Sequence, residues 1–326
     1  MSCYHPNIGI WNGEFTENGK KKIRIIGMNK EDTIEDLKKT GAILIPCGHC
    51  IGCRLDYSRR WADRMMLELE TAKKAVFVTL TYSNENAHWT QFDNDYNPLF
   101  ATLDKRDCQL FMKRLRKAFP DVKIRFFLAG EYGDKTLRPH YHSIIYGIGL
   151  DDFTDLRFFG KNDMQQNYYV SEKLEKNIWK NGHVLLADVS WNTCAYVGRY
   201  VTKKLSGDKE ISYAERNVRK EFSLMSRKPG IGADYLKLHP DCLDFSSINL
   251  TTPDGGLKIS IPKYYMDKLE LIDKEKYDKI KNERRQYAND KMLLKLSKTD
   301  LGLAEYLETC ESNKTASVKA LQRKKV

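Results

Sequence analysis

The stretch GEYGDKTLRPHYHSIIYG, residues 130–147, decides the fold at the centre of this chain. Two runs rich in aromatic and β-branched residues meet there, residues 123–133 and 139–149, and a short turn containing Gly, Asp and Lys separates them. Such runs on either side of a turn predict two strands paired as an antiparallel hairpin.

The second strand of this hairpin carries two histidines one residue apart. Because side chains of a strand alternate between its faces, His140 and His142 share one face and Tyr141 points to the other, core-facing side. Glu131 lies on the preceding strand, nine residues before His140. Pairing of the strands would bring one carboxylate to two imidazoles, a set that suits Mg²⁺ or Mn²⁺, and also zinc. The alternative is a strand whose two histidines are simply partly buried polar residues.

The segments around the hairpin alternate between strand and helix patterns. The expected strands are residues 75–82 and 182–190, and the expected helices are residues 56–74, 103–119 and 191–205, the last with Ser190 as its N-cap. This order predicts an α+β fold in which helices lie against a mainly antiparallel sheet. The polar residues 83–100 predict a loop between a strand and a helix.

The basic helix at residues 103–119 has two readings. Its Lys113, Arg114, Arg116 and Lys117 can face phosphate, or they can form an ordinary solvated face. Beyond residue 205 the patterns weaken. Residues 273–298 predict a highly charged helix, and residues 313–326 predict a frayed basic tail.

Composition favours a polyanionic partner. The 326 residues carry a net charge of +11 together with 18 tyrosines and 13 phenylalanines. Cations attract phosphates, and aromatic rings stack on unpaired bases. No apolar run approaches the ~20 residues needed to cross a bilayer, and the first residues lack the pattern of a signal peptide, so we expect no membrane association and a cytoplasmic protein.

Four cysteines near the N-terminus predict a zinc site. Cys47, Cys50 and Cys53 stand at two successive C-x-x-C spacings, and in a reducing compartment such thiolates bind one tetrahedral ion. Cys3 is the expected fourth ligand, and His49 is the alternative. A closed four-ligand site leaves no position for substrate, so we assign it a structural role. The other interpretation is free or redox-active thiols.

The stretch YVGRYVTKK, residues 196–204, predicts a helix with one polar, aromatic face. At ~100° per residue, Tyr196, Tyr200, Lys203 and Lys204 fall on that face. A tyrosine hydroxyl has a pKa of ~10, so it attacks only an electrophile that is already polarised, for example by a metal ion. The alternative is a packing stripe of two tyrosines.

Three of these motifs together resemble the HUH replication initiators, which nick single-stranded DNA. They are FVTLTY, the acid and H-x-H hairpin, and YVGRYVTKK, and the chain is most similar to initiators of gokushovirus-type single-stranded DNA phages (Microviridae). The stretch PCGHCIGCR after an N-terminal cysteine is similar to the same phage subgroup. The resemblance covers residues 1–205 and implies the HUH fold, in which a central antiparallel sheet carries the two histidines on a middle strand.

The resemblance also implies residue roles. Glu131, His140 and His142 would bind the catalytic Mg²⁺ or Mn²⁺, and Tyr196 and Tyr200 would be the nucleophiles.

Lys203 or Lys204 would be the cation that steadies the phosphate. The chain departs from the family pattern at His49, where lysine is expected, and Tyr141 is aromatic where an aliphatic residue is usual.

The implied activity is initiation of rolling-circle replication. The enzyme would nick origin DNA, keep a 5′-phosphotyrosine link, leave a 3′-hydroxyl primer, and rejoin DNA to release circles. No G-x-x-x-x-G-K-[ST] loop occurs, so helicase as well as polymerase would come from the host, in whose cytoplasm the protein would act. The alternative is a non-catalytic, zinc-containing protein that binds single-stranded nucleic acid. The motif order argues against a relaxase.

The expected division has three parts. Residues 1–55 form the zinc-binding element, residues 56–205 the nicking core, and residues 206–326 a largely helical, basic extension.

Overall fold

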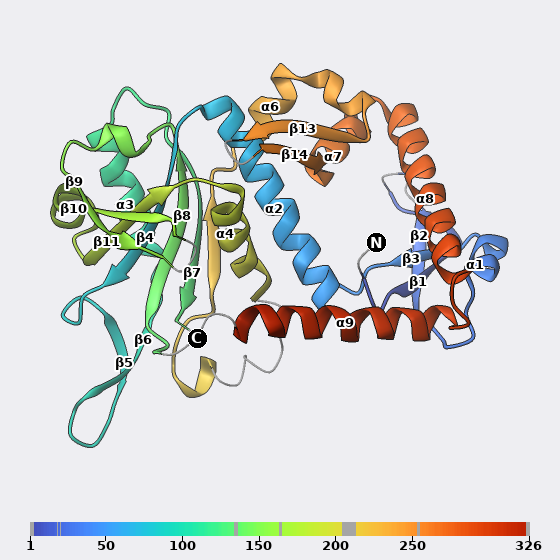
Figure 1. Cartoon of the computed structure of the whole chain (residues 1–326), viewed down its shortest axis with the longest axis horizontal. Coiled ribbons are helices and arrows are strands. Elements are labelled where there is room, and N and C mark those ends of the chain that lie inside the picture. The colour runs from blue at the N-terminus through green and yellow to red at the C-terminus, as the bar shows by residue number, and fades with distance from the viewer. Residues whose placement is uncertain are drawn as a thin grey trace. The chain divides into compact units, whose positions relative to one another are not determined.

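A computed structural model of the chain divides into two compact units, which we describe one at a time (Figure 1). The larger unit is Tyr57–Tyr265, and the smaller one combines Met1–Asp56 with Met266–Val326. The structure describes residues 3–17, 19, 21–133, 136–162, 165–203, 213–252 and 255–323, without the side chains of residues 200–203 and 320–323. The three-part division expected from the sequence stays a prediction.

A seven-stranded sheet forms the centre of the larger unit. Its order is β12-β7-β8-β4-β11-β10-β9, and every neighbouring pair is antiparallel. The strands are β4 (Ala75–Tyr82), β7 (Arg125–Tyr132), β8 (Pro139–Tyr146), β9 (Leu156–Lys161), β10 (Asn167–Ser171), β11 (Gly182–Asp188) and β12 (Phe222–Met225). The predicted α+β class, with helices against a mainly antiparallel sheet, is confirmed.

One face of this sheet packs on the main hydrophobic core. Leu80 of β4 and Leu186 of β11 are fully buried there, together with Trp179. The covering elements are α3 (Lys105–Ala118), η1 (Leu150–Asp152) and η2 (Leu174–Trp179). Two of the basic side chains of α3 bind backbone carbonyls, since Arg114 donates to residues Ile178 and Trp179 and Arg116 donates to Ile124.

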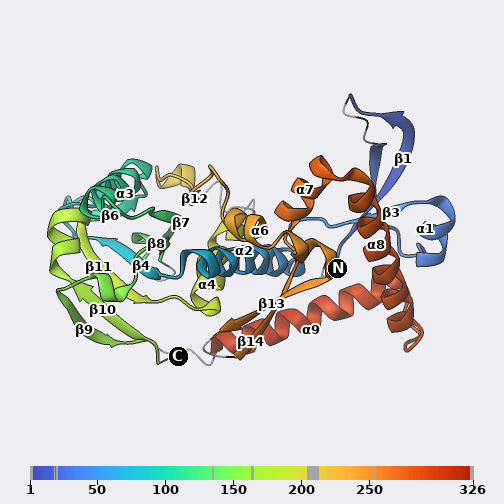
Figure 2. The same ribbon diagram turned by 90° about the horizontal axis from the view of Figure 1, so that it is seen from above.

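Helices α2 (Ile51–Ala72) and α4 (Trp191–Lys203) cover part of the opposite face, on which α4 contacts β7, β8 and β12 (Figure 2). Ser190 caps α4 as expected, because its hydroxyl accepts the Thr193 backbone N–H at 3.3 Å. The two helices approach closely at Gly198, where a Cβ atom would lie 2.9 Å from the Ser58 carbonyl oxygen. The glycine of YVGRY therefore serves helix packing.

The polar stretch at residues 83–100 is not the uninterrupted loop that we expected. It contains most of a hairpin, β5 (His88–Phe92) and β6 (Pro98–Thr102). Asp93 organises the turn, because its Oδ1 accepts the backbone N–H groups of Asp95 and Asn97. The loop prediction is wrong here because side-chain hydrogen bonds, which composition does not reveal, close the hairpin.

The rest of the larger unit follows the sheet in sequence. It contains α6 (Ala233–Leu238), η3 (Pro240–Asp244), β13 (Ser247–Thr252) and β14 (Gly255–Ser260), and α7 (Lys263–Ile272) continues past its boundary.

The smaller unit holds a three-stranded sheet of order β2-β1-β3 that the sequence patterns did not predict. Its elements are β1 (Asn7–Phe15), β2 (Lys21–Gly27), α1 (Ile34–Thr40), β3 (Ile43–Ile45), α8 (Lys274–Leu296) and α9 (Leu303–Arg323). Helix α8 confirms the expected charged helix. The frayed tail is wrong for the described residues, because α9 is anchored where Leu303 and Leu307 pack with Ile8 and Leu37. No helix in the described part of the chain is long and apolar enough to span a bilayer.

Candidate active site

Pairing of β7 with β8 brings together the acid and both histidines. Glu131 stands directly opposite His140 in the register. The Nε2 atoms of His140 and His142 lie 2.9 Å and 3.0 Å from the same Glu131 carboxylate oxygen. One ligand atom from each of the three residues lies within 4.8 Å of the others. The hairpin geometry expected from the sequence therefore forms a compact set of three donors.

The outer nitrogen of each imidazole is already bound to protein. Nδ1 of His140 lies 3.0 Å from the Arg138 carbonyl oxygen, and Nδ1 of His142 lies 3.0 Å from the Thr79 hydroxyl. A carbonyl can only accept, so Nδ1 of His140 carries a proton and its neutral ring presents a lone pair at Nε2. That lone pair faces a carboxylate oxygen, an arrangement that needs a proton or a cation between the two. Anchored outer nitrogens of this kind are typical of metal-binding histidines.

The carboxylate of this set is ionised. Burial by itself would raise the pKa of the Glu131 carboxyl, but the hydrogen bonds and charges of His140 and His142 outweigh it and lower the pKa to about 2. Phe77 stacks on the His142 ring at 5.7 Å between centroids, which holds the ring plane. Two nitrogen donors and one oxygen donor, all preoriented, fit a divalent cation.

Helix α4 brings Tyr196 to this set. The Tyr196 hydroxyl lies 3.4 Å from Nε2 of His142, and the two rings meet edge to face at 4.9 Å. Anchors on α2 hold α4 in this position, since Ser58 donates to the Ala195 carbonyl and Trp191 donates to Asp63. The expected meeting of helix and hairpin is therefore present for the first tyrosine.

The other expected residues of the YVGRYVTKK motif are described in part. The backbone of Tyr200 and Lys203 lies in α4, and their side chains are outside the described atoms. Lys204 lies outside the described residues.

Sequence reasoning missed two residues that support the histidines. Thr79 stands opposite His142 in the β4–β8 register and binds its Nδ1, and the alternation of FVTLTY could have placed it on that face. Arg138 binds the Asn84 side chain and the Tyr82 carbonyl, which fixes the turn that leads into His140. No sequence signal marks Arg138, because its partners lie more than fifty residues away along the chain.

The four N-terminal cysteines form a second cluster, in the smaller unit. Cys3, Cys47, Cys50 and Cys53 place their sulfur atoms within 4.8 Å of one another. Two sulfur pairs, Cys47–Cys53 and Cys3–Cys50, are 4.0 Å apart. A tetrahedral zinc ion with Zn–S bonds of ~2.3 Å requires sulfur atoms ~3.8 Å apart, so the spacing fits. The His49 side chain is exposed and is not part of this group.

Backbone N–H groups point at these sulfur atoms. Those of His49 and Cys50 donate to Cys47 Sγ, and that of Cys53 donates to Cys50 Sγ. Burial would raise the pKa of the Cys47 thiol, but these hydrogen bonds outweigh it and lower the pKa to about 7. Burial raises the pKa of Cys53 to about 11, so a bound cation is needed to keep all four sulfurs as thiolates.

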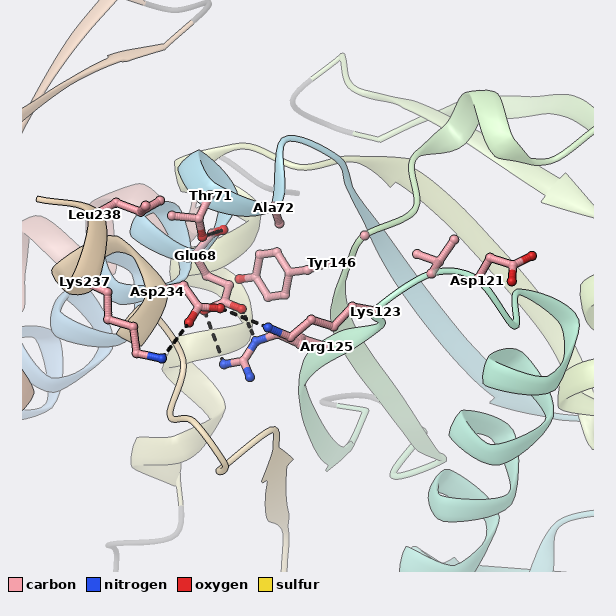
Figure 3. A pocket seen from close by; sticks show the side chains of 12 residues that line it. Glu68, Thr71, Ala72, Asp121, Lys123, Arg125, Tyr146, Asp234, Lys237 and Leu238 are labelled. Atoms are coloured by element: carbon pink, nitrogen blue, oxygen red, sulfur yellow. Dashed lines mark hydrogen bonds and ion pairs between the residues drawn. The ribbon is translucent and has the colours of Figure 1, made fainter.

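A separate pocket of about 630 Å³ lies at the far end of β7 and β8, beside the last turns of α2 (Figure 3). Arg125 forms a buried ion pair with Glu68 there, and Lys123 and Lys237 both lie against Asp234. Arg125 also donates to two backbone carbonyls. These charges already have partners within the fold, so we assign them to structure.

Comparison with known proteins points to one group. The family model for Replication-associated protein ORF2 matches residues 75–205, which hold β4, the β7–β8 hairpin and α4. The chain is 29% identical over 309 residues to the replication-associated protein ORF2 of Spiroplasma virus 4, covering 91% of this chain and 88% of that protein.

Two further relatives are also phage proteins. The replication-associated protein VP4 of Bdellovibrio phage phiMH2K is 28% identical over 245 residues, 74% of this chain and 72% of that protein. The replication-associated protein ORF4 of Chlamydia phage 1 is 28% identical over 237 residues, 71% of this chain and 55% of that protein. No solved structure matches. These matches confirm the resemblance to phage replication proteins that the motifs indicated.

Proposed function

We propose that this chain initiates replication of a phage genome by nicking single-stranded origin DNA through a tyrosine, on an HUH fold. The observation that carries the proposal is the Tyr196 hydroxyl, 3.4 Å from His142 Nε2, beside three donor atoms that fit a divalent cation. The relatives are named replication-associated proteins, which supports the replication role.

Glu131, His140 and His142 would hold Mg²⁺ or Mn²⁺. When bound, the cation would polarise the scissile phosphate and offset its negative charge. The protein prepares this site in advance, because Thr79 and the Arg138 carbonyl fix both imidazoles. Helix α4 presents the Tyr196 hydroxyl beside the same site, so that little motion is needed for attack.

The nicking step exchanges one phosphodiester for another. The Tyr196 oxygen forms a bond to phosphorus, the bond from phosphorus to the 3′-oxygen breaks, and the phenol proton ends on that oxygen. The products are a 5′-phosphotyrosine and a 3′-hydroxyl that primes a host polymerase. Because no water enters, the bond energy is kept and rejoining needs no ATP. Tyr200 would make the second cut after one round, and Lys203 or Lys204 would steady the phosphate.

The four-cysteine cluster would hold a structural zinc ion. It joins Cys3 to the first turn of α2, where Cys53 lies, and its four sulfurs leave no position for substrate. Strand separation would be supplied by a host helicase.

A covalent adduct assay tests the nicking proposal. Purified protein is incubated with labelled single-stranded origin DNA and Mn²⁺, and denaturing gels show whether label stays on the protein. We expect an adduct that Tyr196→Phe with Tyr200→Phe abolishes and that either single variant retains in part. Absence of an adduct from the wild type, or its persistence in the double variant, contradicts the proposal. DNA binding without an adduct or any dependence on metal would instead support a non-catalytic single-strand-binding protein.

A further inference from the structure

The sheet of the larger unit is covered unevenly on the side that carries the histidines. Under α4 and α2, Phe127 and Ala129 of β7 are fully buried on this side. Beyond β4 the same side is exposed to a much greater degree. The His183 side chain of β11 is 73% exposed, whereas its neighbour Val184, on the opposite face, is fully buried.

The strand registers define a straight row across this exposed half. Residues that stand directly opposite one another in an antiparallel pair share a face. From β8 outward to the edge strand β9, the row is His142, Thr79, Leu185, Val170 and Arg157. The metal-site histidine is thus the inner end of the row, and an arginine is the outer end.

Every member of this row beyond His142 is partly or fully exposed. Tyr168 lies beside it on the same face, two residues from Val170 on β10, and is also partly exposed. The distance from β8 to β10 is three strand spacings, about 14 Å. The acidic neighbour Glu172 is ion-paired with Lys176 and does not oppose a phosphate here.

We propose that this row, with Tyr168, is the track along which the single-stranded substrate lies on leaving the metal site. The inference rests on the proposed function, which supplies the substrate class. The Tyr168 ring offers a surface on which a base can stack, Leu185 and Val170 offer apolar contact, and Arg157 meets a phosphate. A duplex cannot place its bases on a flat sheet, so the track selects unpaired DNA.

The test measures binding apart from cleavage. The full chain is titrated into a short fluorescent single-stranded oligonucleotide with EDTA present, and anisotropy gives Kd. Loss of one stacked base by Tyr168→Ala should weaken binding by about tenfold, while Tyr168→Phe should bind as the wild type does. Phe158→Ala is the matched control, because Phe158 is 61% exposed on the neighbouring strand and faces the other side with Tyr169.

Arg157 gives a second measurement. Arg157→Gln should lower the slope of log Kd against log salt by about 0.7, the loss of one phosphate contact to a single strand. An unchanged slope together with wild-type affinity of Tyr168→Ala overturns the track, as does equal weakening by Phe158→Ala. Comparing the thermal melts of the variants detects misfolding.

The outcomes separate the two proposals. Adduct formation by the wild type, with no effect of Tyr168→Ala on binding, overturns the track and leaves tyrosine nicking in place. Weakened binding by Tyr168→Ala, with no adduct in the wild type, supports the track and overturns nicking. A wild type that binds no single-stranded DNA overturns both.

Discussion

The two ligand clusters of this protein differ in how many positions around an ion they fill. The four cysteines of the smaller unit offer four sulfurs at tetrahedral spacing, whereas Glu131, His140 and His142 offer three donors and stand beside a tyrosine hydroxyl. A filled set can stabilise a fold, and an incomplete set can also bind substrate. The difference teaches that donor number and neighbouring groups, more than donor type, separate a structural from a catalytic site.

The largest expected effect is on the closed cluster. Cys50→Ser should release the bound zinc and destabilise the smaller unit by more than about 5 kcal/mol, because metal binding there contributes directly to folding. Zinc content by mass spectrometry and the thermal melt measure both. Cys310→Ser is the control, since Cys310 is in the same unit and outside the cluster. Full zinc content in Cys50→Ser would show that the cluster is not a zinc site.

The open cluster should respond in the opposite way, with activity lost and fold kept. His142→Ala should lower the rate of adduct formation by about 10³-fold, equal to about 4 kcal/mol, because the cation loses a ligand. The thermal melt should stay close to that of the wild type. A rate within a few-fold of the wild type would show that His142 does not serve the reaction.

A smaller effect is expected one bond away from the open cluster. Thr79→Val keeps the shape of the side chain but removes the hydroxyl that holds His142 Nδ1, and should weaken Mn²⁺ activation by about tenfold. Titrating Mn²⁺ in the adduct assay gives the half-activating concentration. Thr81→Val is a matched control on the next position of the same face of β4. Equal responses of both variants would show that the Thr79 contact has no special role.

The smallest effect should come from the exposed neighbour of the closed cluster. His49→Ala is expected to change zinc affinity by less than about twofold, because its side chain is exposed and outside the group of four. Competition with a zinc chelator measures it. A loss of more than tenfold would make His49 a ligand in place of one cysteine.

The features predicted correctly from the sequence are those with a short period or a short spacing. Alternation placed His140 and His142 on one face and Tyr141 in the core, where it is fully buried, and the C-x-x-C spacing identified three of the four clustered sulfurs. The Ser190 cap was predicted for the same reason. These features depend on backbone geometry over a few residues, which the local order of residue types reports directly.

The features that were missed depend on contacts between distant segments. The hairpin in residues 83–100, the three-stranded sheet of the smaller unit and the full length of α9 follow from turn hydrogen bonds and from packing of separate segments. Local propensity is too weak to reveal such contacts.

By itself, the sequence determined the donor types and the faces on which they stand, because side-chain chemistry and strand period are local properties. Only the tertiary structure decided which of them meet. Pairing of β4 with β8 set Thr79 against His142, and packing of α4 on α2 at Gly198 carried Tyr196 to within 3.4 Å of the same ring. The uneven covering of the sheet was also a tertiary decision, since it depends on where two helices pack and not on the strands beneath them.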